Sequence, residues 1–169
     1  MRVSVPLRRA YRLINHGPTT LITSAAGGRQ NVMAAAWVMA LDIDPPKACA
    51  VIAEGTFTRE LVDASREFVV HVPTAAMVDE TYYAGSVSGR DEDKLKRFRT
   101  VPASLVQAPL IEGCAAWLEC RVIEEPQIAT KYDLFVAEVV AAWADDALFV
   151  NGEWKLDREE TRSLHHLSK

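Results

Sequence analysis

The stretch NVMAAAWVMALDIDPP, residues 31–46, decides the fold and raises the question of function. Three consecutive alanines, 34–36, stand where larger side chains would fill a core. Alanine favours helices, but the glycines before the stretch and the prolines after it are typical boundaries of a strand. We therefore interpret the stretch as a strand, in which Ala34 and Ala36 share one face and Ala35 and Trp37 share the other.

Small side chains on a strand have two explanations, and the residues alone leave both open. They leave the backbone amides accessible to a planar ligand, which would stack on the strand or bind it edge-on. They also permit a tight core contact between two sheets. The first explanation predicts a binding site and the second predicts only close packing.

Most of the remaining chain alternates like β-strands. Predicted strands cover 19–25, 47–53, 67–73, 114–128 and 132–145, and an Asn-Gly turn follows in ALFVNGEW. Predicted helices cover 58–66, with Thr58 as N-cap, 74–85, ended by Gly85, and a short segment around DKLKRF. This balance predicts a mainly β fold with a few helices, a Greek-key-like antiparallel barrel rather than a doubly wound sheet. The Rossmann G-x-G-x-x-G fingerprint is absent from the sequence.

Length and composition predict a soluble protein of one domain spanning residues 1–169. The net charge of −4 argues against nucleic-acid or anionic-membrane partners. No apolar run approaches the ~20 residues of a membrane span, and no secretory signal is visible. Cys49, Cys114 and Cys120 are odd in number and form no CxxC pair. We expect them to be buried thiols in a reducing cytoplasm, rather than disulfides or zinc ligands.

The segment EGTFTRE, residues 54–60, suits a phosphate group. Thr56 and Thr58 offer hydroxyls, Gly55 permits close backbone approach, and a helix is expected to begin at once. Free amides at a helix start favour anions. A plain N-cap explains Thr58 without any ligand.

A second polar segment, SVSGRDEDK at 86–94, has the composition of an anion-binding loop. Ser88, Gly89, Arg90 and Lys94 place a hydroxyl, a flexible backbone and two cations within seven residues. Loops rich in Ser, Gly and Asp are also ordinary solvated turns.

Catalytic side chains and metal ligands are not predicted. The four histidines, His16, His71, His165 and His166, accompany no nucleophile motif such as G-x-S-x-G, and no metal-ligand spacing is present. His71 lies inside a strand pattern and is expected to be a packed residue. We expect His165 and His166 at the surface or at a dimer contact.

In their order and spacing these segments resemble the flavin reductase-like FMN-binding split-barrel proteins, particularly the flavoredoxin branch. The matching pieces are GGRQNVMAAAWVMALDIDPP, TFT before a helix, EFVVHVP, GSVSGRDEDK, APLIEGCAAWLECRVIEE and YDLFVAEVVAAW. The resemblance covers roughly residues 15 to 167 and implies a split β-barrel.

The resemblance also implies a binding site for FMN. The implied cofactor-binding residues are Asn31, Met33, Ala34, Ala35, Ala36 and Trp37 beside the ring and ribityl chain, Thr56 and Thr58 at the phosphate, and Ser88, Gly89, Arg90 and Lys94 closing the site. It further implies a homodimer with FMN at the subunit interface. NADH or NADPH as electron donor, and a small molecule or protein as acceptor, rest on the resemblance alone.

The leading hypothesis is therefore an FMN-dependent oxidoreductase, an NAD(P)H-dependent flavin reductase or a flavoredoxin-like electron-transfer enzyme. One alternative is a non-catalytic flavin-binding electron carrier. Another is a split barrel that has lost FMN, because Ala34 stands where the branch often has Thr and Glu54 where a neutral amide is common.

Overall fold

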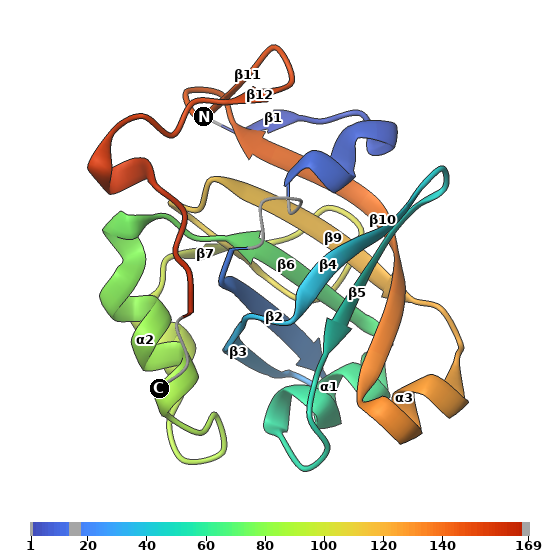
Figure 1. Cartoon of the computed structure of the whole chain (residues 1–169). Coiled ribbons are helices and arrows are strands. Elements are labelled where there is room, and N and C mark those ends of the chain that lie inside the picture. Colours follow the sequence, from blue (N-terminus) through green and yellow to red (C-terminus); the bar gives the residue numbers. More distant parts are fainter. Residues whose placement is uncertain (1, 14–17, 167–169) are drawn as a thin grey trace.

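The computed structural model describes residues 2–13 and 18–166, so His16 lies outside the described residues. An eight-stranded sheet carries three α-helices around it (Figure 1). The strands are β1 (Arg2–Ser4), β2 (Thr20–Ala26), β3 (Arg29–Ala35), β4 (Val38–Ile43), β5 (Pro46–Val51), β6 (Glu67–Val72), β7 (Thr100–Val101), β8 (Leu110–Ile111), β9 (Ala116–Val122), β10 (Leu134–Asp145), β11 (Phe149–Val150) and β12 (Glu153–Trp154). The helices are α1 (Phe57–Ser65), α2 (Val78–Ser86) and α3 (Pro126–Tyr132), with 3₁₀ turns at Leu7–Leu13, Ala75–Met77, Lys94–Arg97 and Glu159–Thr161. Among the described residues, no helix has the length and apolar character needed to cross a membrane.

The main sheet is antiparallel and curls into a barrel that is not closed. Its strand order is β3-β2-β6-β9-β10-β5-β4, with β1 paired to β10. The two end strands, β3 and β4, are consecutive in the chain and are joined only by Ala36 and Trp37. The predicted mainly β split barrel is confirmed, and the alanine stretch ends at the opening of the barrel.

A tight hairpin fixes the register of the alanine stretch. Gly27 and Gly28 form the turn with φ of 56° and 76°, a conformation that glycine adopts without strain. The register then pairs Thr20 with Ala35 and Leu21 with Ala34. The stretch is therefore a strand and not a helix, as predicted.

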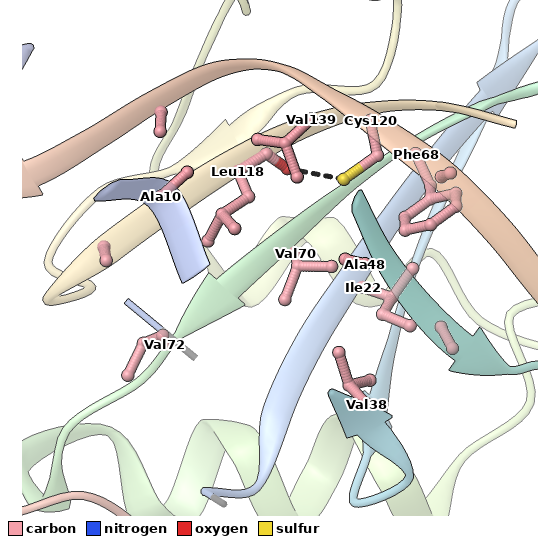
Figure 2. Packing of buried hydrophobic residues seen from close by; sticks show 14 of the residues in the cluster. Ala10, Ile22, Val38, Ala48, Phe68, Val70, Val72, Leu118, Cys120 and Val139 are labelled. Atoms are coloured by element: carbon pink, nitrogen blue, oxygen red, sulfur yellow. Dashed lines mark hydrogen bonds between the residues drawn. The ribbon is translucent and has the colours of Figure 1, made fainter. Parts of the chain in front are cut away.

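Strands β2, β6 and β9 are buried on both faces. Ile22, Val70 and Leu118 point into the barrel, where they pack with residues such as Phe68 and Cys120 (Figure 2). The alternate residues on the same strands, Leu21, Val69 and Trp117, belong to a second cluster with Ala84 of α2 and Leu110. Two cores thus hold the central strands rigidly, which favours a stable support for any site built on β3.

Three predicted boundaries are wrong, each for a local reason. Helix α1 begins earlier than expected and Thr56, not Thr58, is its N-cap, since the Thr56 hydroxyl accepts from the Arg59 amide. Helix α2 continues to Ser86, so Gly85 lies inside it rather than ending it. The predicted strand 114–128 contains the start of α3, because Pro126 suits the first turn of a helix.

His71 is a packed residue, as predicted. Its Nδ1 lies 3.1 Å from the Leu21 carbonyl oxygen and its Nε2 accepts from the Ile111 amide at 3.1 Å. The ring is fully buried, and burial lowers its pKa to about 4. The three cysteines are also buried free thiols, as expected.

The neutral His71 ring makes stability depend on pH. The unfolded chain binds a proton at pH ~6.5, whereas the folded ring resists it until about pH 4. Its stabilising contribution is therefore complete above the unfolded pKa and is lost as pH falls. We expect the free energy of unfolding to drop by about 3 kcal/mol between pH 7 and 4 from this residue. Urea unfolding across that range checks this, and His71→Gln should show a correspondingly shallower dependence; parallel curves for the two proteins would contradict it.

Candidate functional site

Two adjoining hollows run along β3. The first, about 340 Å³, lies between β3, the start of α1 and the loop after α2. It is lined by Asn31, Met33, Ala34, Gly55, Thr56, Phe57, Thr58, Ala84, Gly85, Val87, Ser88, Gly89, Arg90 and Lys94, and we call it the polar hollow. The second, about 720 Å³, is lined by Thr19, Met33, Ala34, Ala35, Ala36, Trp37, Val51, Ala53, Thr56, His165 and His166, and we call it the alanine hollow. Because Met33, Ala34 and Thr56 line both, the hollows form one chamber.

All twelve residues predicted from the sequence line this chamber. Asn31, Met33, Ala34, Thr56, Thr58, Ser88, Gly89, Arg90 and Lys94 line the polar hollow, and Ala35, Ala36 and Trp37 line the alanine hollow. Segments separated by more than fifty residues are thus brought together. Their assignment to a particular ligand stays a prediction.

The three alanines are small for three different reasons. Ala34 lies against α2: a Cβ added to Gly85 would lie only 3.2 Å from the Cβ of Ala34. Ala35 packs into the barrel core. Ala36 follows the last residue of β3 and is exposed to the alanine hollow, beside Trp37, whose surface is 75% exposed. Close packing and an accessible backbone therefore both occur, at neighbouring residues.

Asn31 and Thr58 form a buried polar pair at the polar hollow. The Asn31 side-chain amide donates to the Thr58 hydroxyl at 2.8 Å. The Asn31 Oδ1 is buried without a hydrogen-bond partner among the described residues. A Cβ on Gly89 would lie 2.1 Å from that oxygen, so the loop passes Asn31 only because residue 89 is glycine. An N-cap role, the alternative for Thr58, is excluded because Thr56 fills it.

The start of α1 presents free amide donors to the same hollow. Thr56 uses its hydroxyl within the chain, since it donates to the Ala53 carbonyl at 2.8 Å and accepts from the Arg59 amide at 3.2 Å. The amides of Phe57 and Thr58 belong to the first turn, whose N–H groups have no partner within the helix. Such a helix start favours an anion.

Two cations border the polar hollow. The Lys94 side chain is buried and its Nζ donates to the Ala84 carbonyl at 2.8 Å. Within residues 2–13 and 18–166 it forms no ion pair, and burial lowers its pKa to about 8. Arg90 donates to the Gly55 carbonyl at 2.7 Å and lies 3.2 Å from a Glu60 oxygen, so it bridges the loop to α1. A buried lysine without a carboxylate is a position where an anion would be stabilised.

Other charged residues of the same segments, which would repel or attract an anion, do not line the polar hollow. Glu54 is exposed and lines neither hollow. Asp91, Glu92 and Asp93 do not line the polar hollow; they line the neighbouring groove, which shares Phe57, Gly89 and Arg90 with it. Arg59 is held by Asp63, by Asp133 and by backbone carbonyls, and does not reach the chamber.

Sequence reasoning missed several chamber residues. The tail histidines, His165 and His166, are exposed, as expected, but they also line the alanine hollow. The tail reaches it because the Thr19 amide donates to the Leu164 carbonyl at 2.7 Å and the Ala75 amide to the Arg162 carbonyl at 2.8 Å. No local pattern in the tail indicates these long-range contacts, although two adjacent histidines are a signal of possible chemistry.

Known proteins share this sequence and this architecture. A family model described as flavin reductase like domain matches residues 12–155. The uncharacterized protein YddH of Escherichia coli (strain K12) is 41% identical over 98% of this chain and 90% of its own. The crystal structure of an FMN-binding domain of a flavin reductases-like enzyme from Shewanella baltica OS155 has 42% identity and a TM-score of 0.96, covering 100% of this chain and 91% of that one.

A flavoredoxin from Methanosarcina acetivorans is more distant, with 32% identity and a TM-score of 0.76 over 85% of this chain and 77% of its own. The family model and the long, strongly similar relatives agree with the architecture of the split barrel. This chain belongs to the flavin reductase-like family.

Proposed function

We propose that this protein is an FMN-dependent oxidoreductase, which takes electrons from NADH or NADPH and passes them to a small-molecule or protein acceptor. One observation carries the proposal: a hollow lined mainly by alanines and other small or apolar residues continues into a polar hollow with free amides and two cations. A ligand made of a neutral planar ring joined to a phosphate would match the two hollows, with the ring beside the alanines and the phosphate in the polar hollow. Two similar structures, an FMN-binding domain and a flavoredoxin, support this ligand class.

The dimensions of the chamber suit this ligand. From Asn31 to Ala36 the chain advances five residues, about 17 Å at the rise of a strand. Two polar groups lie at the Asn31 end of that distance: Asn31 Oδ1, which has no partner among the described residues, and the buried Lys94 ammonium, whose partner is the Ala84 carbonyl rather than a carboxylate. They fit the polar tail of a flavin mononucleotide.

In the polar hollow the chain's own groups would bind the phosphate. The Thr58 hydroxyl already accepts from Asn31, which leaves its hydrogen to donate to an anion. The Phe57 and Thr58 amides add two backbone donors. Lys94 supplies positive charge, which a bound dianion would keep protonated above its lowered pKa.

In the alanine hollow the chain would orient the ring and leave one face open. Bound FMN supplies the redox chemistry, so no nucleophilic side chain is required. Ala34 and Ala36 keep the backbone accessible, and the exposed Trp37 offers an aromatic edge beside it. A nicotinamide donor would need to stack on the open face within ~3.5 Å of the reacting atom. The buried free thiols suit the reducing cytoplasm that we propose as the site of action.

We further propose a homodimer with the chamber at its interface. Trp37, Met39, Leu41 and Ile43 expose half or more of their surfaces along the β4 edge of the sheet. Exposed apolar edge strands favour pairing with a second chain. Because Trp37 also lines the alanine hollow, a second copy on this edge would complete the chamber wall.

The freshly purified protein tests the main proposal. We expect absorption bands at about 370 and 450 nm from bound flavin. Steady-state oxidation of NADH or NADPH should proceed on the order of 1 s⁻¹ or faster. Stoichiometric FMN without turnover would favour the electron carrier. Colourless protein that does not quench FMN fluorescence would contradict flavin binding altogether.

Ala36→Leu tests the position of the ring when FMN binding is measured by the quenching of FMN fluorescence. Because Ala36 is exposed to the hollow, a larger side chain should occupy ring space without disturbing the core. We expect its unfolding free energy to stay within about 0.5 kcal/mol of wild type. The control, Ala36→Ser, should bind FMN normally; if Ala36→Leu binds as tightly, the ring does not lie there.

The phosphate role of Thr58 is tested by comparing FMN with riboflavin. Thr58→Val removes a hydrogen bond to a charged group, worth about 1.5–3 kcal/mol. Isothermal titration should therefore give at least about tenfold weaker FMN binding, with riboflavin affected less. Thr58→Ser retains the hydroxyl and should restore FMN binding. Equal losses for FMN and riboflavin would place the phosphate elsewhere.

The dimer is tested by Met39→Lys, which puts a charge on the β4 edge. We expect the solution mass to change from twice 18.7 kDa to 18.7 kDa, with weaker FMN binding in parallel, because burying an unpaired charge is costly. Tyr82→Lys, at an exposed aromatic position on α2, is the matched control and should leave both unchanged. If light scattering shows that the wild-type protein is a monomer, the homodimer proposal is wrong.

A further inference from the structure

The alanine hollow has an unusual wall, formed by the tail histidines. His165 and His166 line it together with the small residues 34–36. The His165 Nε2 lies 3.2 Å from the Ser163 hydroxyl. Two backbone hydrogen bonds, from Thr19 and from Ala75, fix the residues just before them. The imidazoles are therefore positioned by the fold, while both remain exposed.

Among the residues that the structure describes, these imidazoles are the ionisable side chains of that hollow. The other described lining residues, contributed by β3, the β3–β4 connection, β5 and the segments at Thr19 and Thr56, carry no acid or base. Lys94 and Arg90 line the polar hollow, and neither lines the alanine hollow. A charge that develops on a ligand in the alanine hollow would therefore interact most directly with the side chains of His165 and His166.

We propose that His165 and His166 stabilise the reduced form of the ring in the alanine hollow by binding a proton. This inference rests on the proposed function, because it needs a flavin in the chamber. Reduction by a hydride donor adds two electrons and one proton to a neutral ring, which leaves one negative charge. An imidazole nearby then takes one further proton from solvent, and the imidazolium offsets that charge. Neither histidine donates its proton to the ring. Both act on the ring through their positive charge alone.

The direction of the pH dependence follows from this coupling. An imidazole beside an anionic ring binds a proton more strongly than one beside a neutral ring. The stabilisation of the reduced form is complete at low pH, where the imidazole is protonated, and is lost over the pH range in which that proton leaves. Over this window each further proton changes the reduction equilibrium constant by up to tenfold per pH unit, about 30 mV for a two-electron couple.

The test is a reductive titration of the FMN-loaded protein with dithionite, against a dye of known potential, from pH 5.5 to 8.5. The variants are the double substitution His165→Gln with His166→Gln, and Arg162→Gln. Arg162→Gln removes a positive charge from the same tail at a residue outside the hollow, and is the matched control. Because these side chains are exposed, all variants should keep the wild-type thermal unfolding.

We expect the wild type and Arg162→Gln to share a steeper dependence of the potential on pH within this range, which the double variant lacks. At pH 6 the double variant should bind reduced FMN about fivefold more weakly than wild type, with oxidised FMN little changed. Superimposable potentials for wild type and the double variant would overturn the inference while flavin binding stands. Absence of a flavin spectrum in the wild type would overturn the proposed function and the inference together.

Discussion

The chamber depends on two close backbone approaches to β3. The loop after α2 passes Asn31 at residue 89, where a Cβ would meet the Asn31 oxygen at 2.1 Å. Helix α2 itself passes Ala34 at Gly85, where a Cβ would lie at 3.2 Å. Side chains larger than hydrogen at these crossings would push α2 and its loop outward. The polar hollow would then lose the geometry that brings Arg90 and Lys94 to the start of α1.

The same region contains polar groups that the protein alone does not satisfy. Most buried polar groups in proteins have partners, yet Asn31 Oδ1 has none among the described residues. Lys94 is buried with a carbonyl rather than a carboxylate. The Ser24 and Thr81 hydroxyls are also buried without a partner among the described residues, but only Asn31 of these three lines the chamber. Exceptions of this kind are expected where a fold serves binding rather than its own stability.

Local chemistry explains which features the sequence predicts well. The Gly27-Gly28 turn sets one register, and alternation over β2, β3, β6, β9 and β10 sets the faces, so the barrel and the helix at 57–65 follow. Thr56 and Thr58 both suit an N-cap by sequence, and only the hydrogen bond from the Arg59 amide to the Thr56 hydroxyl distinguishes them. The sequence does not indicate helix α3, because its apolar residues continue the alternation of β9.

Long-range contacts explain what the sequence leaves out. The twelve predicted residues come from three segments whose order matches a family, and the structure brings those segments to one chamber. The place of His165 and His166 instead depends on Thr19 and Ala75, more than eighty residues away. Nothing in the sequence near the tail encodes those partners.

At the opening of the barrel, the groups that suit an anion and the groups proposed to surround the ring lie at opposite ends of β3. At one end of β3 the hydroxyl of Thr58 and the cations suit an anion, and these groups determine where the phosphate of a ligand can lie. At the other end the described lining consists of uncharged residues, among them the three alanines and Trp37, together with two imidazoles. A ring held there borders neutral protein on its sheet side, so its electronic properties depend mainly on proton uptake at the tail. Binding and redox tuning would then reside in different segments, and substitutions in one need not disturb the other.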